Sequence, residues 1–455
     1  MKFTDLGLST PILKTLQVND YTVPTPIQQQ AIPPVMDGKD LIGLAQTGTG
    51  KTAAFSLPIL HRLSATKPAE PRKLRALILA PTRELATQIN DAIWTYSKGL
   101  GLKSACVIGG VPIRKQQRLI AAGIDILVAT PGRLEDLIAQ KSVTLKHIES
   151  VVLDEADQML DIGFMPAIRR LLSQMPKSRQ TLLFSATMPK EISALADDHL
   201  SDPVQVSVTP VSSTAERIEQ SVVHMDGASK PTAIFKLVQK HPGKRVIVFT
   251  RTKRGADKVA KKLSAEGIGA DAIHGNKSQG QRQRALDAFR KGDKPVLIAT
   301  DIAARGIDIR DIELVVNYDL PNVPEAYVHR IGRTARAGAS GFAVAFCAPD
   351  EVKLLRAIEK VIKKQIPASM ADGSPAPKSD APSRSKPSGQ RRGNAGGGNN
   401  RGRGDAKSAA GEGEGGNPNK RPWHKRRSAN TDANAGLKSK RPKRSKSSGS
   451  HASAN

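Results

Sequence analysis

An acidic cluster directly follows an apolar run near residue 150. Residues 150–153 are Ser-Val-Val-Leu, and the next four are Asp154, Glu155, Ala156 and Asp157. The chain has a formal net charge of +28, so surface acidity alone does not explain three carboxylates where a buried strand is expected to end. Carboxylates placed there are suited to hold a divalent cation and to take a proton from water.

A glycine-rich segment after another apolar run supplies complementary chemistry. It consists of Ala45, Gln46, Thr47, Gly48, Thr49, Gly50, Lys51 and Thr52. Backbone N–H groups of such a loop face phosphates, while Lys51 reaches the β and γ oxygens and the Thr52 hydroxyl coordinates Mg²⁺. Ala45 stands where the strict pattern has its first glycine, but the context of strand, loop and helix is that of a P-loop. The segment therefore predicts nucleotide binding.

The two segments together predict a hydrolytic site. Asp154 is the expected second partner of Mg²⁺, and Glu155 is the expected base that orients and deprotonates the attacking water. A charge cluster that complements a helix dipole stays an alternative for Asp157. A GTPase would carry Asn-Lys-x-Asp, whereas residues 276–279 read Asn-Lys-Ser-Gln. A small-molecule kinase is disfavoured because such P-loop proteins usually lack a second set of strands.

Short apolar runs alternate with helical patterns through the first 368 residues. The predicted strands lie at residues 41–45, 76–79, 126–128, 151–153 and 182–184 and, in a second set, at 246–249, 296–298, 314–316 and 343–346. Apolar runs separated by helix-length intervals indicate parallel sheets covered on both faces. A segment at about residues 203–219 predicts an extended linker. We expect two α/β domains in tandem, with the ligand site in the cleft between them.

The composition changes at about residue 370. Residues 371–455 contain no Ile, Val, Met, Phe or Tyr, and 19 Lys and Arg against 6 Asp and Glu give them a net charge of +13. Such a segment cannot bury enough apolar surface to offset the entropy of ordering, so it is predicted to be disordered. The basic character throughout the chain favours a polyanionic partner over a membrane.

The two cysteines, Cys106 and Cys347, lie within separate apolar stretches. They are expected to be small core residues rather than a disulfide or a metal site. No apolar run reaches about 18 residues, and the chain opens without a signal-like pattern. A cytosolic protein is therefore expected.

The motifs of residues 1–368, taken in order, resemble those of the DEAD-box ATP-dependent RNA helicases of superfamily 2. They are Phe3, residues 21–28, the P-loop, residues 81–85, 109–110, 130–133, 154–157 and 185–187, then residues 248–251, Gln279 with Arg282, residues 299–308 and residues 329–336. The resemblance implies two RecA-like domains at residues 1–205 and 219–368, a linker at 206–218 and a disordered basic tail at 369–455.

The resemblance further implies an ATP site shared by both domains. Gln28 would hydrogen-bond the adenine edge, and an aromatic residue of the same region, Phe3 or Tyr21, would pack on the base. Taken alone, Gln28 would be interpreted as a solvated residue at a helix start. Asp308 of the second domain would contact the ribose.

Catalysis and coupling are also implied by the resemblance. Lys51, Asp154 and Glu155 would act with two arginine fingers, Arg333 and Arg336, from the second domain. The coupling network would contain Asp157, Ser185, Thr187 and His329. Ala335 stands where the family often has glycine, which leaves both fingers in place.

RNA is the partner that the resemblance implies, single-stranded or as a short duplex, and largely independent of sequence. The backbone-contacting positions would be Thr82, Arg83, Gly110, Thr130, Arg133, Gln279, Arg282 and Thr300. Arginines, hydroxyls and glycines can hold a sugar-phosphate chain without contacting bases. Arg83 and Arg133 could instead form surface salt bridges.

The predicted function is local, ATP-driven unwinding of short RNA duplexes and remodelling of ribonucleoproteins. An ATP-gated RNA clamp or chaperone is the alternative, and a DNA helicase is disfavoured by the Gln28 region. Residues 249–253 and 273–279 resemble the bacterial RhlE-type sub-family. Ribosomal precursors and the RNA-decay machinery are possible partners, but the sequence does not identify the physiological RNA. The tail would tether RNA nonspecifically or act as a solvated spacer.

Overall fold

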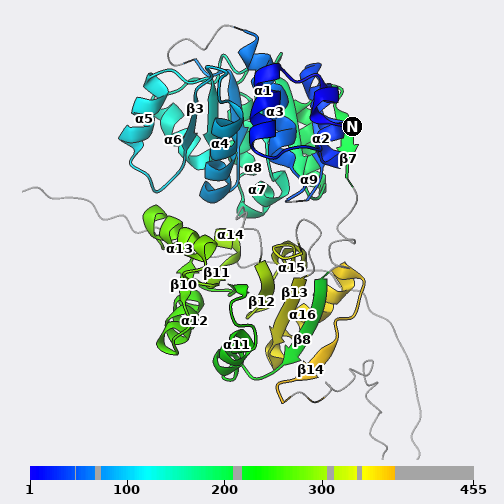
Figure 1. Cartoon of the computed structure of the whole chain (residues 1–455), viewed down its shortest axis with the longest axis vertical. Coiled ribbons are helices and arrows are strands. Elements are labelled where there is room, and N and C mark those ends of the chain that lie inside the picture. Colours follow the sequence, from blue (N-terminus) through cyan, green and yellow to red (C-terminus); the bar gives the residue numbers. More distant parts are fainter. Residues whose placement is uncertain are drawn as a thin grey trace, which may run out of the picture. The chain divides into compact units, whose positions relative to one another are not determined.

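Each half of the described chain is built around a seven-stranded sheet (Figure 1). The computed structural model describes residues 1–46, 48–66, 73–208, 218–304, 312–335, 341–372 and 374. The strand orders are β3-β4-β2-β5-β6-β1-β7 and β10-β11-β9-β12-β13-β8-β14, and the strand pairs within them are parallel. The predicted tandem α/β architecture is confirmed.

The first half alternates strands with helices. Its strands are β1 (Leu41–Leu44), β2 (Ala76–Leu79), β3 (Ser104–Val107), β4 (Ile126–Ala129), β5 (Ser150–Leu153), β6 (Gln180–Ser185) and β7 (Val204–Ser207). Its helices are η1 (Phe3–Leu6), α1 (Thr10–Val18), α2 (Pro26–Met36), α3 (Lys51–Ser64), α4 (Arg83–Tyr96), α5 (Ile113–Ala121), α6 (Pro131–Ala139), α7 (Ala156–Ile162), α8 (Met165–Leu172) and α9 (Lys190–His199).

The second half repeats the pattern. Its strands are β8 (Ile218–His224), β9 (Arg245–Phe249), β10 (Ala270–Ile273), β11 (Val296–Ala299), β12 (Ile312–Asn317), β13 (Gly341–Cys347) and β14 (Ala368–Met370). Its helices are α11 (Lys230–Gln239), α12 (Lys253–Ala265), α13 (Gln279–Lys291), α14 (Asp301–Ala304), α15 (Pro324–Ile331), η3 (Pro349–Glu351) and α16 (Val352–Ile362).

Each central strand contributes to cores on both faces of its sheet. In β5, Val152 packs with α1 to α4, whereas Val151 and Leu153 pack with residues of α6 to α9. Successive side chains of a strand point to opposite faces, so a fully covered strand is mostly apolar, although β6 also buries Gln180, Thr181 and Ser185. This is why the continuous apolar runs predicted the central strands.

The outer strands were not predicted. β3, β7, β10 and β14 are short and lie toward the edges of their sheets, where less of each side chain is covered. β7 and β8 extend into the predicted linker, and the rest of it, residues 209–217, lies outside the described residues. β14 continues the second sheet to Met370, and the predicted tail beyond residue 374 lies outside the described residues as well.

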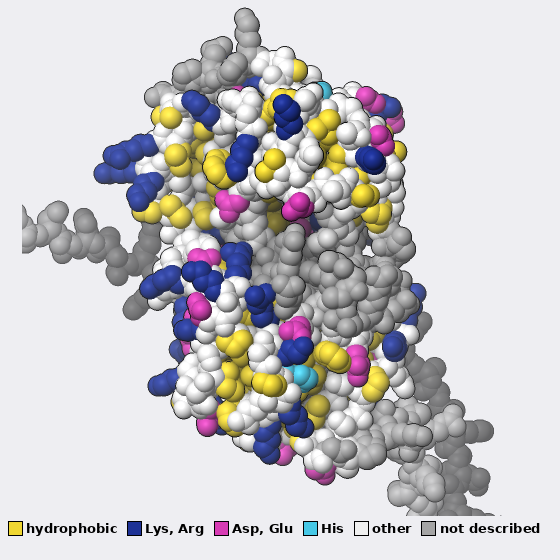
Figure 2. Space-filling model, viewed as in Figure 1, with side chains coloured by type: hydrophobic (Ala, Val, Ile, Leu, Met, Phe, Trp, Pro, Cys, Tyr) yellow, Lys and Arg dark blue, Asp and Glu magenta, His cyan; other side chains and the backbone are white. Residues whose placement is uncertain are grey.

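The described surface is basic and the two cysteines are unpaired, as the composition predicts. Figure 2 shows Lys and Arg outnumbering acidic side chains on one face. Both cysteines are free, and burial raises the pKa of the Cys106 thiol to about 12 and that of Cys347 to about 11. No helix within the described ranges is long and apolar enough to cross a membrane.

Candidate functional site: an ATP pocket and an RNA-binding edge

The P-loop and the acidic cluster lie at the same edge of the first sheet. β1 and β5 are both neighbours of β6, and parallel strands present their carboxyl ends at one edge. Lys51 begins α3, is only 5% exposed, and its Nζ donates a hydrogen bond of 3.0 Å to the Ala45 carbonyl. The loop thus holds the ammonium in place before any phosphate binds.

Glycine at position 50 is required by its backbone and its neighbours. Gly50 has φ of +97°, and a Cβ there would lie 2.5 Å from Gln28 Nε2. The Thr49 hydroxyl donates to the Gln46 carbonyl at 2.8 Å, which closes the turn, and Thr52 follows Lys51 in the first turn of α3. Thr47 lies outside the described residues.

Gln28 links the segment before α2 to the P-loop. Its Oε1 accepts from the Thr25 N–H at 2.9 Å, and its Nε2 donates to the Gly50 carbonyl at 3.1 Å. The side chain is 3% exposed, so it is no solvated helix-start residue. Gln28 lies beside Gly50 of the P-loop. Its contact with adenine stays a prediction.

The two aromatic candidates for the base occupy different settings. Phe3 lies in the hydrophobic core and is 4% exposed. Tyr21 is half-buried and meets Tyr96 edge to face, with ring centroids 5.9 Å apart and hydroxyls 3.1 Å apart. Stacking on adenine stays a prediction for both.

Asp154 and Glu155 are buried carboxylates with little compensation from the protein. They are 2% and 3% exposed, and Asp154 Oδ1 accepts from the Glu155 N–H at 3.0 Å. Glu155 has φ of +54° and an Oε2 atom that no described residue hydrogen-bonds. Burial raises the pKa of Asp154 and raises that of Glu155 to about 7, although the Lys51 ammonium opposes both shifts. A left-handed backbone and an unsatisfied buried oxygen are typical of functional sites.

The protein oxygens at this site could hold Mg²⁺ only if water and a bound phosphate supplied its other ligands. Within the described ranges there is no group of three or more His, Cys, Asp or Glu residues that could hold a metal. Mg²⁺ usually takes one or two carboxylates and completes its shell with water and substrate phosphates. Asp154, with its buried and poorly compensated carboxylate, and the Thr52 hydroxyl fit that arrangement.

Asp157 joins the acidic cluster to the end of β6. Its Oδ2 accepts from the Ala186 N–H at 3.1 Å and from the Thr187 N–H and hydroxyl at 3.0 and 3.1 Å. Its own N–H donates to the Ser185 hydroxyl at 3.2 Å. The structure therefore brings together the predicted Asp157, Ser185 and Thr187. A helix-dipole role alone would not need these contacts.

The first-domain RNA candidates follow strand ends at the same edge. Thr82 caps α4, where its Oγ1 accepts from the Leu85 N–H at 3.2 Å, and Thr130 precedes α6. Burial and the nearby Arg282 lower the pKa of Arg83, whose guanidinium lies where a Cβ on Gly110 would be 2.2 Å away. Gly110 also has φ of +78°, a backbone conformation that favours glycine.

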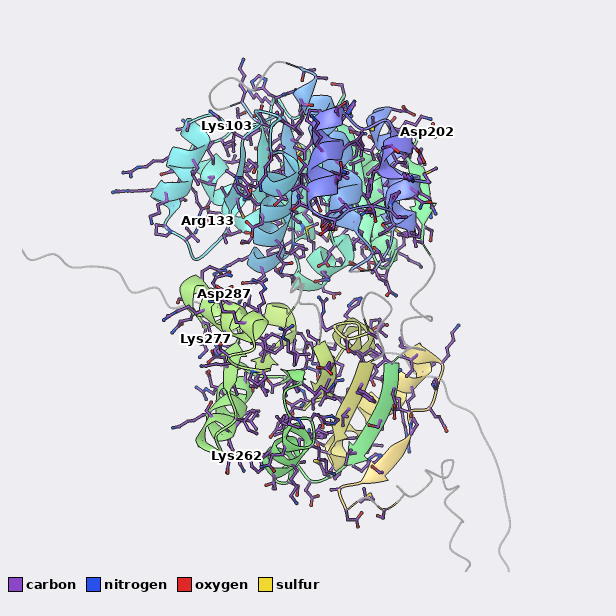
Figure 3. The ribbon with its side chains drawn as sticks, in the orientation of Figure 1. Lys103, Arg133, Asp202, Lys262, Lys277 and Asp287 are labelled. Atoms are coloured by element: carbon purple, nitrogen blue, oxygen red, sulfur yellow. The ribbon has the colours of Figure 1, made fainter. Side chains whose placement is uncertain are left out.

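Arg133, labelled in Figure 3, is held by contacts of its own. Its Nη1 donates to the Val111 carbonyl at 2.8 Å, and its Nε lies 3.5 Å from an Asp136 carboxylate oxygen. It thus combines the predicted alternative, a salt bridge, with support for the loop that carries Gly110.

Gln116 was missed by sequence reasoning. It is 2% exposed, its Oε1 accepts from the Ile108 N–H at 3.1 Å, and its Nε2 donates to the carbonyls of Ile108 at 3.0 Å and Val111 at 3.3 Å. The amide holds the ends of the loop that carries Gly109 and Gly110. The sequence did contain a signal. Gln116 lies three residues after Ile113 and four before Ile120, a spacing that places a glutamine on the inner face of an amphipathic helix.

In the second domain, Arg282 and Gln279 both contact Glu84. Arg282 donates from Nε and Nη2 to the two Glu84 carboxylate oxygens at 2.8 and 2.6 Å, and Gln279 Nε2 donates to Oε1 at 3.2 Å. The guanidinium and the carboxylate are 8% and 2% exposed as side chains. Glu84 was not predicted as a site residue. Thr300 follows β11 at the corresponding strand end.

Of the residues predicted to act from the second domain on the phosphates, Arg333 and His329 are described. Arg333 is 4% exposed and donates from Nε to the His329 carbonyl at 3.3 Å, just beyond α15. Asp308 and Arg336 lie outside the described residues. The finger and coupling roles stay predictions.

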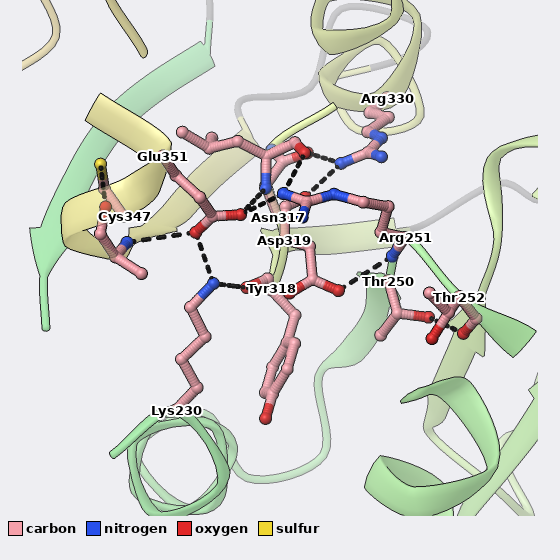
Figure 4. Close-up of polar contacts among 12 residues, drawn as sticks. Lys230, Thr250, Arg251, Thr252, Asn317, Tyr318, Asp319, Arg330, Cys347 and Glu351 are labelled. Carbon is pink, nitrogen blue, oxygen red and sulfur yellow. Dashed lines mark hydrogen bonds and ion pairs between the residues drawn. The ribbon is translucent and has the colours of Figure 1, made fainter. Parts of the chain in front are cut away.

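A partly buried ionic network that includes Arg330 of α15 was also missed (Figure 4). Arg330 is 2% exposed and pairs with both carboxylate oxygens of Asp301 at 2.5 and 2.8 Å. Glu351 accepts from Lys230 at 2.6 Å and from Arg251 at 2.5 Å. Lys230 and Glu351 lie outside the motifs that the sequence singled out. Arg251, Asp301 and Arg330 fall within motif segments, but their spacing does not show which of them pair.

The two parallel sheets and the P-loop place this chain among the P-loop nucleotide-binding proteins with two RecA-like domains. A family model described as DEAD/DEAH box helicase matches residues 25–195, and one described as Helicase conserved C-terminal domain matches residues 229–338. Together they cover more than half of the chain.

Curated relatives and solved structures agree. The chain is 43% identical over 363 residues to the ATP-dependent RNA helicase CshA of Limosilactobacillus reuteri, covering 80% of this chain and 72% of that protein. It is 41% identical to the ATP-dependent rRNA helicase RRP3 of Eremothecium gossypii, covering 82% and 76%. The structure of S. cerevisiae Dbp5 bound to RNA and ADP BeF3 matches with a TM-score of 0.74 and 32% identity, covering 81% and 96%. The chain belongs to the DEAD-box ATP-dependent RNA helicases.

Proposed function

We propose that this helicase separates short RNA duplexes locally by a cycle in which ATP and RNA each favour the closed arrangement of the two domains. Buried Glu155 carries the proposal, because its unpartnered Oε2 lies at the same sheet edge as Lys51. An ATPase base needs a lone pair that the protein leaves free, and no described residue hydrogen-bonds Glu155 Oε2.

The first domain would bind the triphosphate. The P-loop N–H groups would cradle the phosphates, and Lys51 would exchange its contact with the Ala45 carbonyl for a phosphate oxygen. Thr52 and Asp154 would hold Mg²⁺, which neutralises phosphate charge when bound. Glu155 would orient the water and accept its proton.

Coupling to RNA would pass through Asp157 and its contacts with residues 185–187. Arg333 and Arg336 would stabilise phosphate charge after closure, with Asp308 on the ribose and Gln28 on adenine. Because each ligand would bind the closed state more tightly, each would raise the affinity for the other. Release of phosphate would reopen the domains.

The proposed RNA contacts are to the backbone. Phosphates and 2′-hydroxyls would be held without base reading by residues of both domains, namely Thr82, Arg83, Gly110, Thr130, Arg133, Gln279, Arg282 and Thr300. An RhlE-like sub-family, a cytosolic setting and a role on ribosomal precursors or in RNA decay are proposed from the sequence resemblance and the relatives' names. The basic segment after residue 374 would tether RNA.

The test is ATP hydrolysis by the full chain with and without single-stranded RNA. Glu155→Gln should abolish stimulated hydrolysis yet retain ATP binding, whereas Glu191→Gln, the same change at an exposed position, should have no effect. Equal stimulation by DNA would refute the substrate class. RNA-stimulated hydrolysis without separation of a short duplex would favour the clamp. Truncation after Ser374 preserves β14 and should raise the half-saturating RNA concentration.

A further inference from the structure

Helix α5 directly follows the loop that carries Gly109 and Gly110. Gln116 on its inner face holds that loop through Ile108 and Val111, as described above. Gln117, on a neighbouring side, donates to Gln140 Oε1 and Ser142 Oγ, both at 2.9 Å, beyond the end of α6. The helix is therefore anchored both to the loop and to the segment after α6.

The outer face of α5 is strongly basic. Arg114, Lys115 and Arg118 are exposed, and the described part of the chain forms no ion pair with any of them. Residues 97–124 contain five Lys and Arg and no Asp or Glu. Figure 2 shows dark blue side chains gathered over α5 at the edge of the domain.

This cluster differs from the exposed arginines elsewhere in the first domain. Elsewhere in the same domain exposed arginines have carboxylate partners, as in the pairs of Arg170 with Glu135 and of Arg169 with Asp198. Like charges on adjacent helix positions repel one another, so an unpaired group of this kind costs stability unless a polyanion binds it. Its continuity with the Gly110 loop makes a nucleic-acid backbone the fitting polyanion.

We propose that Arg114, Lys115 and Arg118 bind phosphates of RNA that extends beyond the segment held by Gly110 and Arg133. The inference rests on the proposed RNA-binding function. Cations that contact phosphates add affinity without reading sequence. Helix α5 would thus lengthen the RNA site of the first domain and favour longer single strands over short ones.

The experiment compares two triple variants of the full chain. The first is Arg114→Gln, Lys115→Gln and Arg118→Gln. Its control is Lys258→Gln, Lys261→Gln and Lys262→Gln, which removes three exposed charges from α12 instead. Affinity for labelled short and long oligouridylates is measured by anisotropy between 50 and 200 mM salt.

Three lost phosphate contacts should reduce the slope of log affinity against log salt by about 2, at about 0.7 per contact for single strands. A fourfold rise in salt should then weaken the unsubstituted chain about 18-fold more than the α5 variant. The effect should be larger for the long oligonucleotide, and the α12 variant should match the unsubstituted chain.

An unchanged salt slope in the α5 variant would overturn the inference about α5. If RNA still stimulated ATP hydrolysis in that case, the proposed function would stand. No stimulation by RNA in the unsubstituted chain would instead refute the proposed function. If the triple variant unfolds, single substitutions such as Arg118→Gln serve in its place, each expected to lower the slope by about 0.7.

Discussion

Replacing Gln116 by methionine should loosen the Gly109–Gly110 loop without changing the shape of the core. The substitution removes three hydrogen bonds, from the Ile108 N–H and to the carbonyls of Ile108 and Val111. At about 1 kcal/mol for each neutral hydrogen bond, the loop should lose roughly 3 kcal/mol of local stability. That corresponds to a roughly 100-fold change in an opening equilibrium.

The assay is native-state hydrogen exchange of the Ile108 amide, read together with ATPase kinetics. Ile108 exchange should accelerate roughly 100-fold. The half-saturating RNA concentration should rise while the KM for ATP stays constant, because the loop lies outside the P-loop. Gln117→Met is the control. Its bonds lie on the exposed side of α5, so it should change exchange at Ile108 little.

Two results would refute this reasoning. Unchanged exchange at Ile108 would mean that the Gln116 amide does not hold the loop. Faster exchange with an unchanged half-saturating RNA concentration would mean that the loop does not contribute to RNA binding.

Three further predictions concern buried polar groups. Asp157→Ala should lower kcat with RNA more than it alters ATP affinity, since it frees residues 185–187 from charge-assisted bonds worth about 1.5–3 kcal/mol each; an unchanged RNA-stimulated kcat would contradict it. Glu84→Gln should destabilise its contact with Arg282 by about 3–5 kcal/mol by leaving a buried cation unpaired, and adding Arg282→Met should recover most of that loss; additive effects in the double-mutant cycle would contradict it. Raised thiol pKa values predict little thiolate at pH 8, so iodoacetamide should label Cys106 and Cys347 slowly in the native protein and quickly in denaturant; fast native labelling would contradict it.

Local sequence was enough for the central strands and the ATP-site motifs. A strand covered on both faces is apolar along most of its length, so a run such as Val151 and Val152 identifies it without knowledge of the fold. A phosphate-binding loop needs glycine and lysine at adjacent positions, so Gly50 and Lys51 are recognisable by themselves. The edge strand β3 (Ser104–Val107) escaped because it is apolar only in part.

Long-range polar partners could not be predicted in this way. The RNA contact of Arg282 stays a prediction, and the structure adds a carboxylate partner, Glu84, that lies 198 positions earlier in the chain. Likewise, Glu351 and Lys230 are 121 positions apart. The members of such a pair lie in different helices, as Glu84 does in α4 and Arg282 in α13, and no residue spacing within one element records the pair.

The fold class, the P-loop and the acidic strand end can be recognised in the sequence, because each depends on neighbours within a few residues. The contacts that hold these parts in place become visible only in the folded chain. Asp157 is fixed by residues 185–187, and Gln28 by Gly50, across separate elements. The physical reason is that a buried polar group must find its partner wherever folding places one.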